Sequence, residues 1–174
     1  MRTTASIGGA KLPIQIDIGF GDAITPGPLD IDYPVMLDSP VPHIKAYRAE
    51  TVVAEKFEAL VKLGIANTRL KDFYDLWLIS RTFAFKQSVL SRDISATYER
   101  RGTARVIAVP TGLSDDFVLA RAGQWRAFLG RERMVPVPAD LAVVIADLRV
   151  FLMPVTNTAS ATDQYWTPGG PWQP

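Results

Sequence analysis

Four ionisable side chains project toward the apolar sides of two successive predicted helices, where their charge could serve chemistry. In helical projection, Lys56 falls among the leucines of the first helix. Asp72 and Arg69 fall on the mostly apolar side of the second helix, and Asp75 lies at its edge. Buried charges are costly unless they meet one another or a charged ligand. The group predicts either a buried ion-pair network or a site for an anion or a metal-bound nucleotide, and periodicity alone favours neither.

The distribution of proline and glycine predicts the helices that carry these groups. No proline lies between Pro42 and Pro110, and the glycines in that stretch are Gly64 and Gly102. Both residue types interrupt helices, and glycine is favoured just after a helix end. This stretch predicts helices over residues 49–63, 68–82 and 87–101. After Pro110, the sequence predicts a helix or a pair of helices at 115–133 and another helix at 138–153, with Pro138 placed early, where a missing N–H costs nothing.

An alternating segment before the helices predicts a β-strand over residues 12–20. Three isoleucines there alternate with Gln15 and Asp17, which is the period of a half-buried strand. The carboxylate of Asp17 would then lie on the polar face of that strand. Residues 21–44 contain five prolines and a short apolar run, which predicts loops and one more edge strand.

The composition restricts the chemistry. The chain has 174 residues, of which 48% are hydrophobic and 21% charged, as in ordinary folded domains. The net charge of +1 gives no overall basic field, so a local patch would have to hold any nucleic acid. Without cysteine, and with His43 as the single histidine, thiolate sites and all-histidine zinc sites are excluded. Carboxylates must therefore hold any metal ion.

The sequence also predicts a cytoplasmic protein without membrane contact. The N-terminus lacks the apolar region of a secretory leader, and no apolar run is long enough to span a bilayer.

Three stretches of the chain resemble the AbiEii/AbiGii toxin family of nucleotidyltransferases, the toxins of type IV toxin–antitoxin and abortive-infection systems. The stretches are IQIDIGFGD (14–22), ETVVAEKFEALVKLGIANTRLKDFYDLWLIS (50–80) and, more loosely, ATYERRGT (96–103). The resemblance implies an α+β fold with a partial polymerase-β-like nucleotidyltransferase sheet followed by a mainly helical C-terminal bundle. The implied divisions are a sheet at 1–46, a helical domain at 47–154 and a Pro/Gly-rich tail at 155–174.

The resemblance also implies the roles of the charged residues. Asp17 would be the carboxylate that binds Mg²⁺, an ion that prefers hard oxygen ligands. Lys56 would contact the triphosphate of NTP, because an ammonium supplies point charge to phosphate oxygens. Asp72 and Asp75 would be the acidic pair of the catalytic cleft, and we expect Arg69, which projects toward them, to help Lys56 bind the nucleotide.

The implied function is transfer of a nucleotide from NTP to an RNA acceptor, such as tRNA, by a toxin with a cognate antitoxin protein as partner. The family pattern begins, however, with a Gly-Gly or Gly-Ser turn and a D-x-D strand upstream of the strand matching IQIDIGF. Only thirteen residues precede Ile14. We therefore expect an N-terminally truncated chain that is inactive or very weak by itself. The alternative is a non-catalytic remnant that binds an antitoxin as a helical module.

The chain contains a Gly-Gly pair and a D-x-D segment, but their spacing and order differ from those of the family motif. Gly8-Gly9 and Asp30-Ile31-Asp32 lie on opposite sides of the 12–20 strand, and prolines stand just before the first aspartate. We therefore do not expect them to replace the motif.

Other charged residues have structural explanations. Thr51, Glu55 and Glu58 project onto a narrow face of the first helix, where we expect them to meet solvent. Arg100 and Arg101 close the third helix, where they either complement the helix dipole or contact RNA phosphates.

The last part of the chain allows two interpretations of its arginines and tryptophans. The helix at 115–133 either forms an RNA-binding ridge, in which Trp125 and Phe128 lie between arginines, or exposes those arginines as a solvated face. The arginines are Arg121, Arg126, Arg131 and Arg133. Trp166 and Trp172 in the tail either cover the helical body or form a partner surface.

Overall fold

Helices occupy the stretch between Pro42 and Pro110, as predicted, and two more follow it. The computed structural model describes residues 1–16, 18, 27–131, 137–156 and 163–174. The helices are α1 (Ala49–Leu63), α2 (Leu70–Thr82), α3 (Gln87–Arg101), α4 (Asp115–Arg131) and α5 (Leu141–Thr156), with the short turns η1 (Gly64–Ala66) and η2 (Thr111–Leu113). α1 and α3 have the predicted bounds, whereas α2 and α5 begin later than predicted. Together with small antiparallel sheets, these helices confirm the predicted α+β class.

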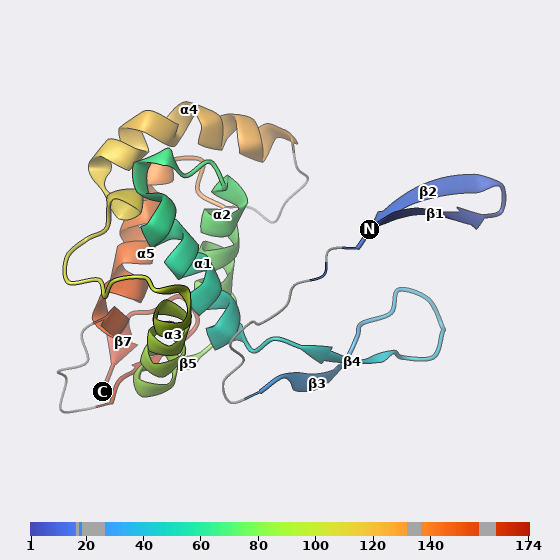
Figure 1. Ribbon diagram of the computed structural model, residues 1–174, viewed down its shortest axis with the longest axis horizontal. Coiled ribbons are helices and arrows are strands. Elements are labelled where there is room, and N and C mark those ends of the chain that lie inside the picture. The colour runs from blue at the N-terminus through green and yellow to red at the C-terminus, as the bar shows by residue number, and fades with distance from the viewer. Residues whose placement is uncertain (17, 19–26, 132–136, 157–162) are drawn as a thin grey trace.

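The helices form one body around an apolar core. α1 packs against α2 and α3, and α5 contacts α2, α3 and α4. α4 crosses one end of this body (Figure 1). Phe57, Leu60, Phe73, Leu148 and Phe151 are fully buried in the core. None of the described helices combines the length and the apolar character needed to cross a lipid bilayer.

Gly102 ends α3 in a conformation that favours glycine. Its φ of 63° and ψ of 29° place it in the left-handed region. The backbone N–H groups of Gly102 and Thr103 donate to the carbonyl oxygens of Glu99 and Tyr98. These bonds satisfy carbonyls that the helix end would otherwise leave open. The turn also directs Thr103 back toward α1.

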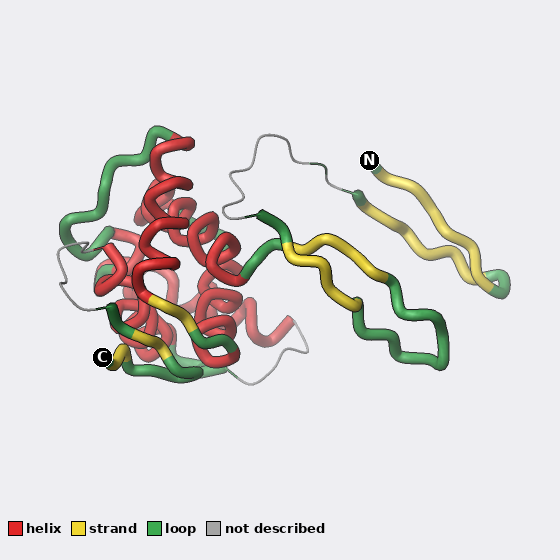
Figure 2. Tube along the Cα trace, turned by 90° about the horizontal axis from the view of Figure 1, so that it is seen from below, coloured by secondary structure: helices red, strands yellow, loops and turns green. Residues whose placement is uncertain are grey.

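The N-terminal strands form two hairpins that project from the helical body (Figure 2). β1 (Arg2–Ile7) pairs with β2 (Ala10–Gln15), and β3 (Leu29–Asp32) pairs with β4 (His43–Ala46), both antiparallel. The predicted half-buried strand over 12–20 is therefore wrong in two respects. The described strand ends at Gln15, and Ile14 and Ile16 are each 40% exposed. Residues 17, 19 and 20 of the predicted strand lie outside the described residues. The alternation of apolar and polar residues correctly predicted a strand, but no other part of the described chain covers the apolar side of β2.

The Gly8-Gly9 pair and the Asp30-Ile31-Asp32 segment lie in different hairpins. Gly8 and Gly9 form the turn between β1 and β2, with φ values of 55° and 86°. In the other hairpin, Asp30 pairs with Lys45 at 3.0 Å and Asp32 contacts His43. Both aspartates are exposed and serve as cross-strand pairs.

The C-terminal tail wraps the helical body, as one of the two interpretations predicted. β5 (Phe85–Lys86), β6 (Tyr165–Trp166) and β7 (Trp172–Gln173) form a small antiparallel sheet. Trp166 is 4% exposed, and its Nε1 donates to the carbonyl oxygen of Ser80 at 2.7 Å. Trp172 Nε1 donates to the carbonyl oxygen of Phe151 at 2.9 Å. The tryptophans are therefore structural.

The arginines of α4 do not form a continuous ridge with Trp125. Trp125 is fully buried, and its Nε1 donates to the carbonyl oxygen of Pro138. Arg121 instead holds the α1–α2 connection, with donors 2.9 Å from the carbonyl oxygen of Ile65 and 3.1 Å from that of Asn67. Arg126 and Arg131 are exposed, and Arg133 lies outside the described residues.

We expect Arg121→Ala to lower the free energy of unfolding by about 2 kcal/mol, because two carbonyl groups lose a charged donor. Urea denaturation followed by circular dichroism measures the change. Arg126→Ala, on the exposed side of the same helix, is the control and should change stability by less than about 0.5 kcal/mol. Equal effects of the two changes would contradict the role given to Arg121.

Candidate functional site

Lys56 meets two aspartates of the next helix in what we call the lysine–aspartate cluster (Lys56, Lys71, Asp72 and Asp75). Lys56 Nζ lies 2.6 Å from Asp72 Oδ1 and 2.8 Å from Asp75 Oδ2. Lys71 Nζ lies 2.8 Å from the other oxygen of Asp75. Of the four charges singled out in the sequence, Lys56, Asp72 and Asp75 therefore meet in an ion-pair network and Arg69 does not join it. Their predicted role in binding or catalysis stays a prediction.

The helical period explains this convergence. Asp72 and Asp75 are three residues apart on α2, so both carboxylates lie on one side of the helix. Lys56 lies in the middle of α1, which packs against α2. The side chains of Lys56, Asp72 and Asp75 are 22%, 17% and 19% exposed. The cluster is thus largely enclosed but still open to solvent on one side.

The pairing shifts the pKa values of Lys56 and Asp75 in opposite directions. Burial lowers the pKa of the Lys56 ammonium, but hydrogen bonds and attraction from Asp72 and Asp75 outweigh it and hold that pKa above its ordinary value. Burial raises the pKa of Asp75, yet hydrogen bonds from Lys56 and Lys71 hold it below its ordinary value. Lys56 therefore stays positively charged at neutral pH.

The low pKa of Asp75 predicts a specific loss of stability in acid. Because the pKa of Asp75 is lower when folded than its ordinary 3.8, its stabilising contribution is present above that value and disappears as pH falls through the folded pKa. We expect Asp75→Asn to flatten the dependence of stability on pH below about pH 4. Urea denaturation at several pH values measures this dependence. Asp38→Asn, at an exposed loop position, should leave the acid limb of the curve unchanged.

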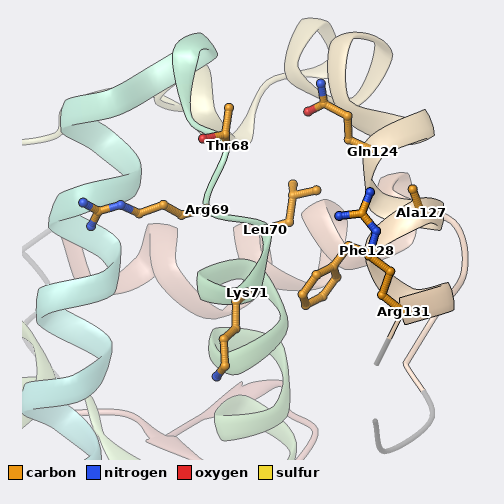
Figure 3. A pocket seen from close by; sticks show the side chains of 8 residues that line it. All are labelled: Thr68, Arg69, Leu70, Lys71, Gln124, Ala127, Phe128 and Arg131. Atoms are coloured by element: carbon orange, nitrogen blue, oxygen red, sulfur yellow. The ribbon is translucent and has the colours of Figure 1, made fainter. Parts of the chain in front are cut away.

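Arg69 does not share the enclosed position of the cluster. Leu70 is the first residue of α2, and Arg69 precedes it with ψ of 66°. Helical projection therefore does not apply to Arg69, and the prediction that it faces the interior is wrong. Its side chain is exposed and points toward α1 (Figure 3). Its predicted contribution to nucleotide binding stays a prediction.

The described residues do not by themselves fit a magnesium ion. They contain no group of three or more His, Cys, Asp or Glu side chains arranged to hold a metal. Asp72 and Asp75 face ammonium groups, which compete with a cation for the carboxylate oxygens. Asp17, the predicted Mg²⁺ ligand, lies outside the described residues.

A second charged network, the glutamate–arginine network (Glu55, Glu58, Arg100, Arg101 and Thr103), joins α1 to α3. Arg101 Nη1 lies 2.7 Å from Glu58 Oε2, and its Nη2 contacts Glu55. Arg100 lies 2.5 Å from Glu55, and the hydroxyl of Thr103 donates to Glu58 at 2.5 Å. The prediction that Glu58 meets solvent is wrong, because its side chain is 0% exposed.

The polar face of α1 was predicted to meet solvent because a helical projection considers one helix at a time. Projection of α1 identified a narrow polar face, but it could not show that α3 covers this face. Thr51, expected on the same face, is also buried. The sequence did contain a signal for this contact between α1 and α3. α1 carries two glutamates, and α3 ends in two adjacent arginines, so opposite charges were available to pair.

The comparison with protein families assigns the class of the protein as nucleotidyl transferase. Residues 1–146 match the family described as "Nucleotidyl transferase AbiEii toxin, Type IV TA system". Because the match covers most of the chain, this protein belongs to the AbiEii family of nucleotidyl transferase toxins. No curated protein and no solved structure matches the chain. Family membership confirms the resemblance carried by the three sequence stretches.

Proposed function

We propose that the protein contributes to transfer of a nucleotide from NTP to an RNA acceptor, with Lys56 contacting the triphosphate. The supporting observation is the position of the Lys56 ammonium, which two carboxylates hold while its side chain remains 22% exposed. A lysine ammonium has three N–H donors. Among the described residues, its hydrogen-bond acceptors are Asp72 and Asp75, so one donor remains for a phosphate oxygen.

In this proposal, Asp72 and Asp75 are positioning residues. They fix the lysine before the nucleotide arrives, so less conformational entropy is lost on binding. The fixed positive charge then stabilises negative charge that develops on the phosphate during transfer. Magnesium would accompany the triphosphate, with Asp17 as the carboxylate proposed to bind it. The proposed partners are NTP, an RNA such as tRNA, and a cognate antitoxin.

The alternative function is a non-catalytic module that binds the antitoxin. The exposed apolar residues of the two hairpins favour it, because surfaces of this kind commonly bind partners. Examples are Ile7, Leu12, Met36 and Leu37, which are between 48% and 100% exposed.

A binding experiment distinguishes the two functions. Equilibrium dialysis of the whole chain against labelled NTP with Mg²⁺ should show saturable binding, and incubation with tRNA should transfer label above the protein-free background. If NTP does not bind, whereas the antitoxin binds tightly in its absence, the proposed transfer function is wrong and the alternative is supported.

A further inference from the structure

A hollow of about 380 Å³, here called the α2–α4 hollow, lies between the start of α2 and the last turns of α4 (Figure 3). Leu70, Ala127 and Phe128 supply its apolar lining, and Arg69, Lys71 and Arg131 supply its cationic residues. No acidic residue lines it within the described part of the chain. Volumes of this order accommodate small ligands, or a single unit of a polymer.

The two arginines of the hollow point in different directions. Figure 3 shows Arg131 and Phe128 together on the α4 side of the hollow, with the ends of their side chains turned apart, whereas Arg69 extends to the opposite side, toward α1. Neither guanidinium forms an ion pair with any described residue, whereas Lys71 is paired with Asp75. Two exposed cations therefore lie at opposite sides of one apolar hollow without a neutralising carboxylate.

This arrangement matches the chemistry of single-stranded nucleic acid. Aromatic rings stack with bases, and cations beside them contact the phosphates of the same strand. A compact ligand with one phosphate group is best held by cations that converge. Cations that diverge fit an extended polyanion better, because successive phosphates can reach each of them. The occupant that fits the hollow is therefore an RNA strand rather than a free mononucleotide.

We propose that the α2–α4 hollow binds one nucleotide of a single-stranded RNA acceptor, with its base against Phe128 and flanking phosphates at Arg131 and Arg69. This inference rests on the proposed function, because it supplies the acceptor for the nucleotide transfer. Lys71 connects the hollow to the lysine–aspartate cluster. It lines the hollow and pairs with Asp75, which also pairs with Lys56. A strand in the hollow would thus lie beside the proposed triphosphate site.

The proposal is tested by fluorescence anisotropy with a 5′-labelled single-stranded RNA, without NTP, so that binding is separated from transfer. Arg131→Gln should weaken binding several-fold and reduce the slope of log affinity against log salt by about 0.7, as expected for one lost phosphate contact. Arg126→Gln, on an exposed part of the same helix outside the hollow, is the matched control and should retain the affinity and the slope.

The stacking contact needs a variant that preserves the core. Phe128 also packs against Tyr74 and Trp125, so its removal would disturb folding. Phe128→Leu keeps an apolar side chain but removes the flat ring, and we expect about tenfold weaker RNA binding. An unchanged unfolding curve confirms that this variant is folded.

Three outcomes would overturn the inference. Equal weakening by Arg126→Gln and Arg131→Gln would indicate nonspecific attraction. Competition by a free mononucleotide at the same nucleotide concentration would indicate a small-molecule pocket. Absence of RNA binding while Lys56-dependent NTP binding persists would reject the hollow but retain the proposed nucleotide site. In contrast, RNA binding that depends on Arg131, together with no NTP binding, would contradict the proposed function and support the hollow.

Discussion

Lys56→Ala is expected to reduce NTP affinity by about 100-fold, which corresponds to loss of one strong charged hydrogen bond. The change removes the ammonium that would contact the triphosphate. It also leaves Asp72 and Asp75 without their shared partner, so two carboxylates would repel the phosphates. Both consequences weaken binding. Equilibrium dialysis with labelled NTP and Mg²⁺ measures the affinity.

The matched control for this experiment is Lys62→Ala. Lys62 lies on the same helix, but it is exposed. Its replacement removes the same charge from the protein without changing the lysine–aspartate cluster, so NTP affinity should stay within about twofold, since exposed charges contribute weakly. Circular dichroism should show that both variants are folded. If Lys56→Ala binds NTP as tightly as the wild type, Lys56 does not contact the triphosphate.

Arg101→Ala should lower the free energy of unfolding by about 3 kcal/mol, because it leaves the buried carboxylate of Glu58 without its cation. Glu58 is 0% exposed, and the hydroxyl of Thr103 would still donate to it. A carboxylate that loses its cation in the interior is costly, since water cannot replace the lost interaction. Glu55 would lose part of its pairing as well. Urea denaturation measures the change.

A double-mutant cycle isolates the pair. Glu58→Gln removes the charge that Arg101 balances, so the Arg101→Ala change should cost less in the Glu58→Gln background than in the wild type. Arg92→Ala is the control, because Arg92 is exposed on the same helix and forms no ion pair within the described residues. Equal costs of Arg101→Ala in the two backgrounds would show that Glu58 and Arg101 are not coupled.

The helices could be predicted from the sequence because their signals are local. Glycine is favoured just after a helix end, so the C-terminal ends of α1 and α3 followed from the positions of Gly64 and Gly102. The signal is not universal, because α4 contains Gly123 and α5 contains Pro154. The helical period also determines which residues share a face. It therefore predicted that Lys56, Asp72 and Asp75 point away from solvent and could meet, as they do.

Tertiary structure alone decided which faces are covered and by what. The polar face of α1 looked solvent-exposed until α3 covered Glu58, and the alternating strand looked half-buried although nothing in the described chain covers it. Arg69 precedes the first turn of α2, where helical periodicity carries no information. The periodicity of one segment shows which of its faces is apolar and which is polar. Whether a face is buried depends on a second segment that is distant in sequence. The α2–α4 hollow likewise arises only when both helices come together.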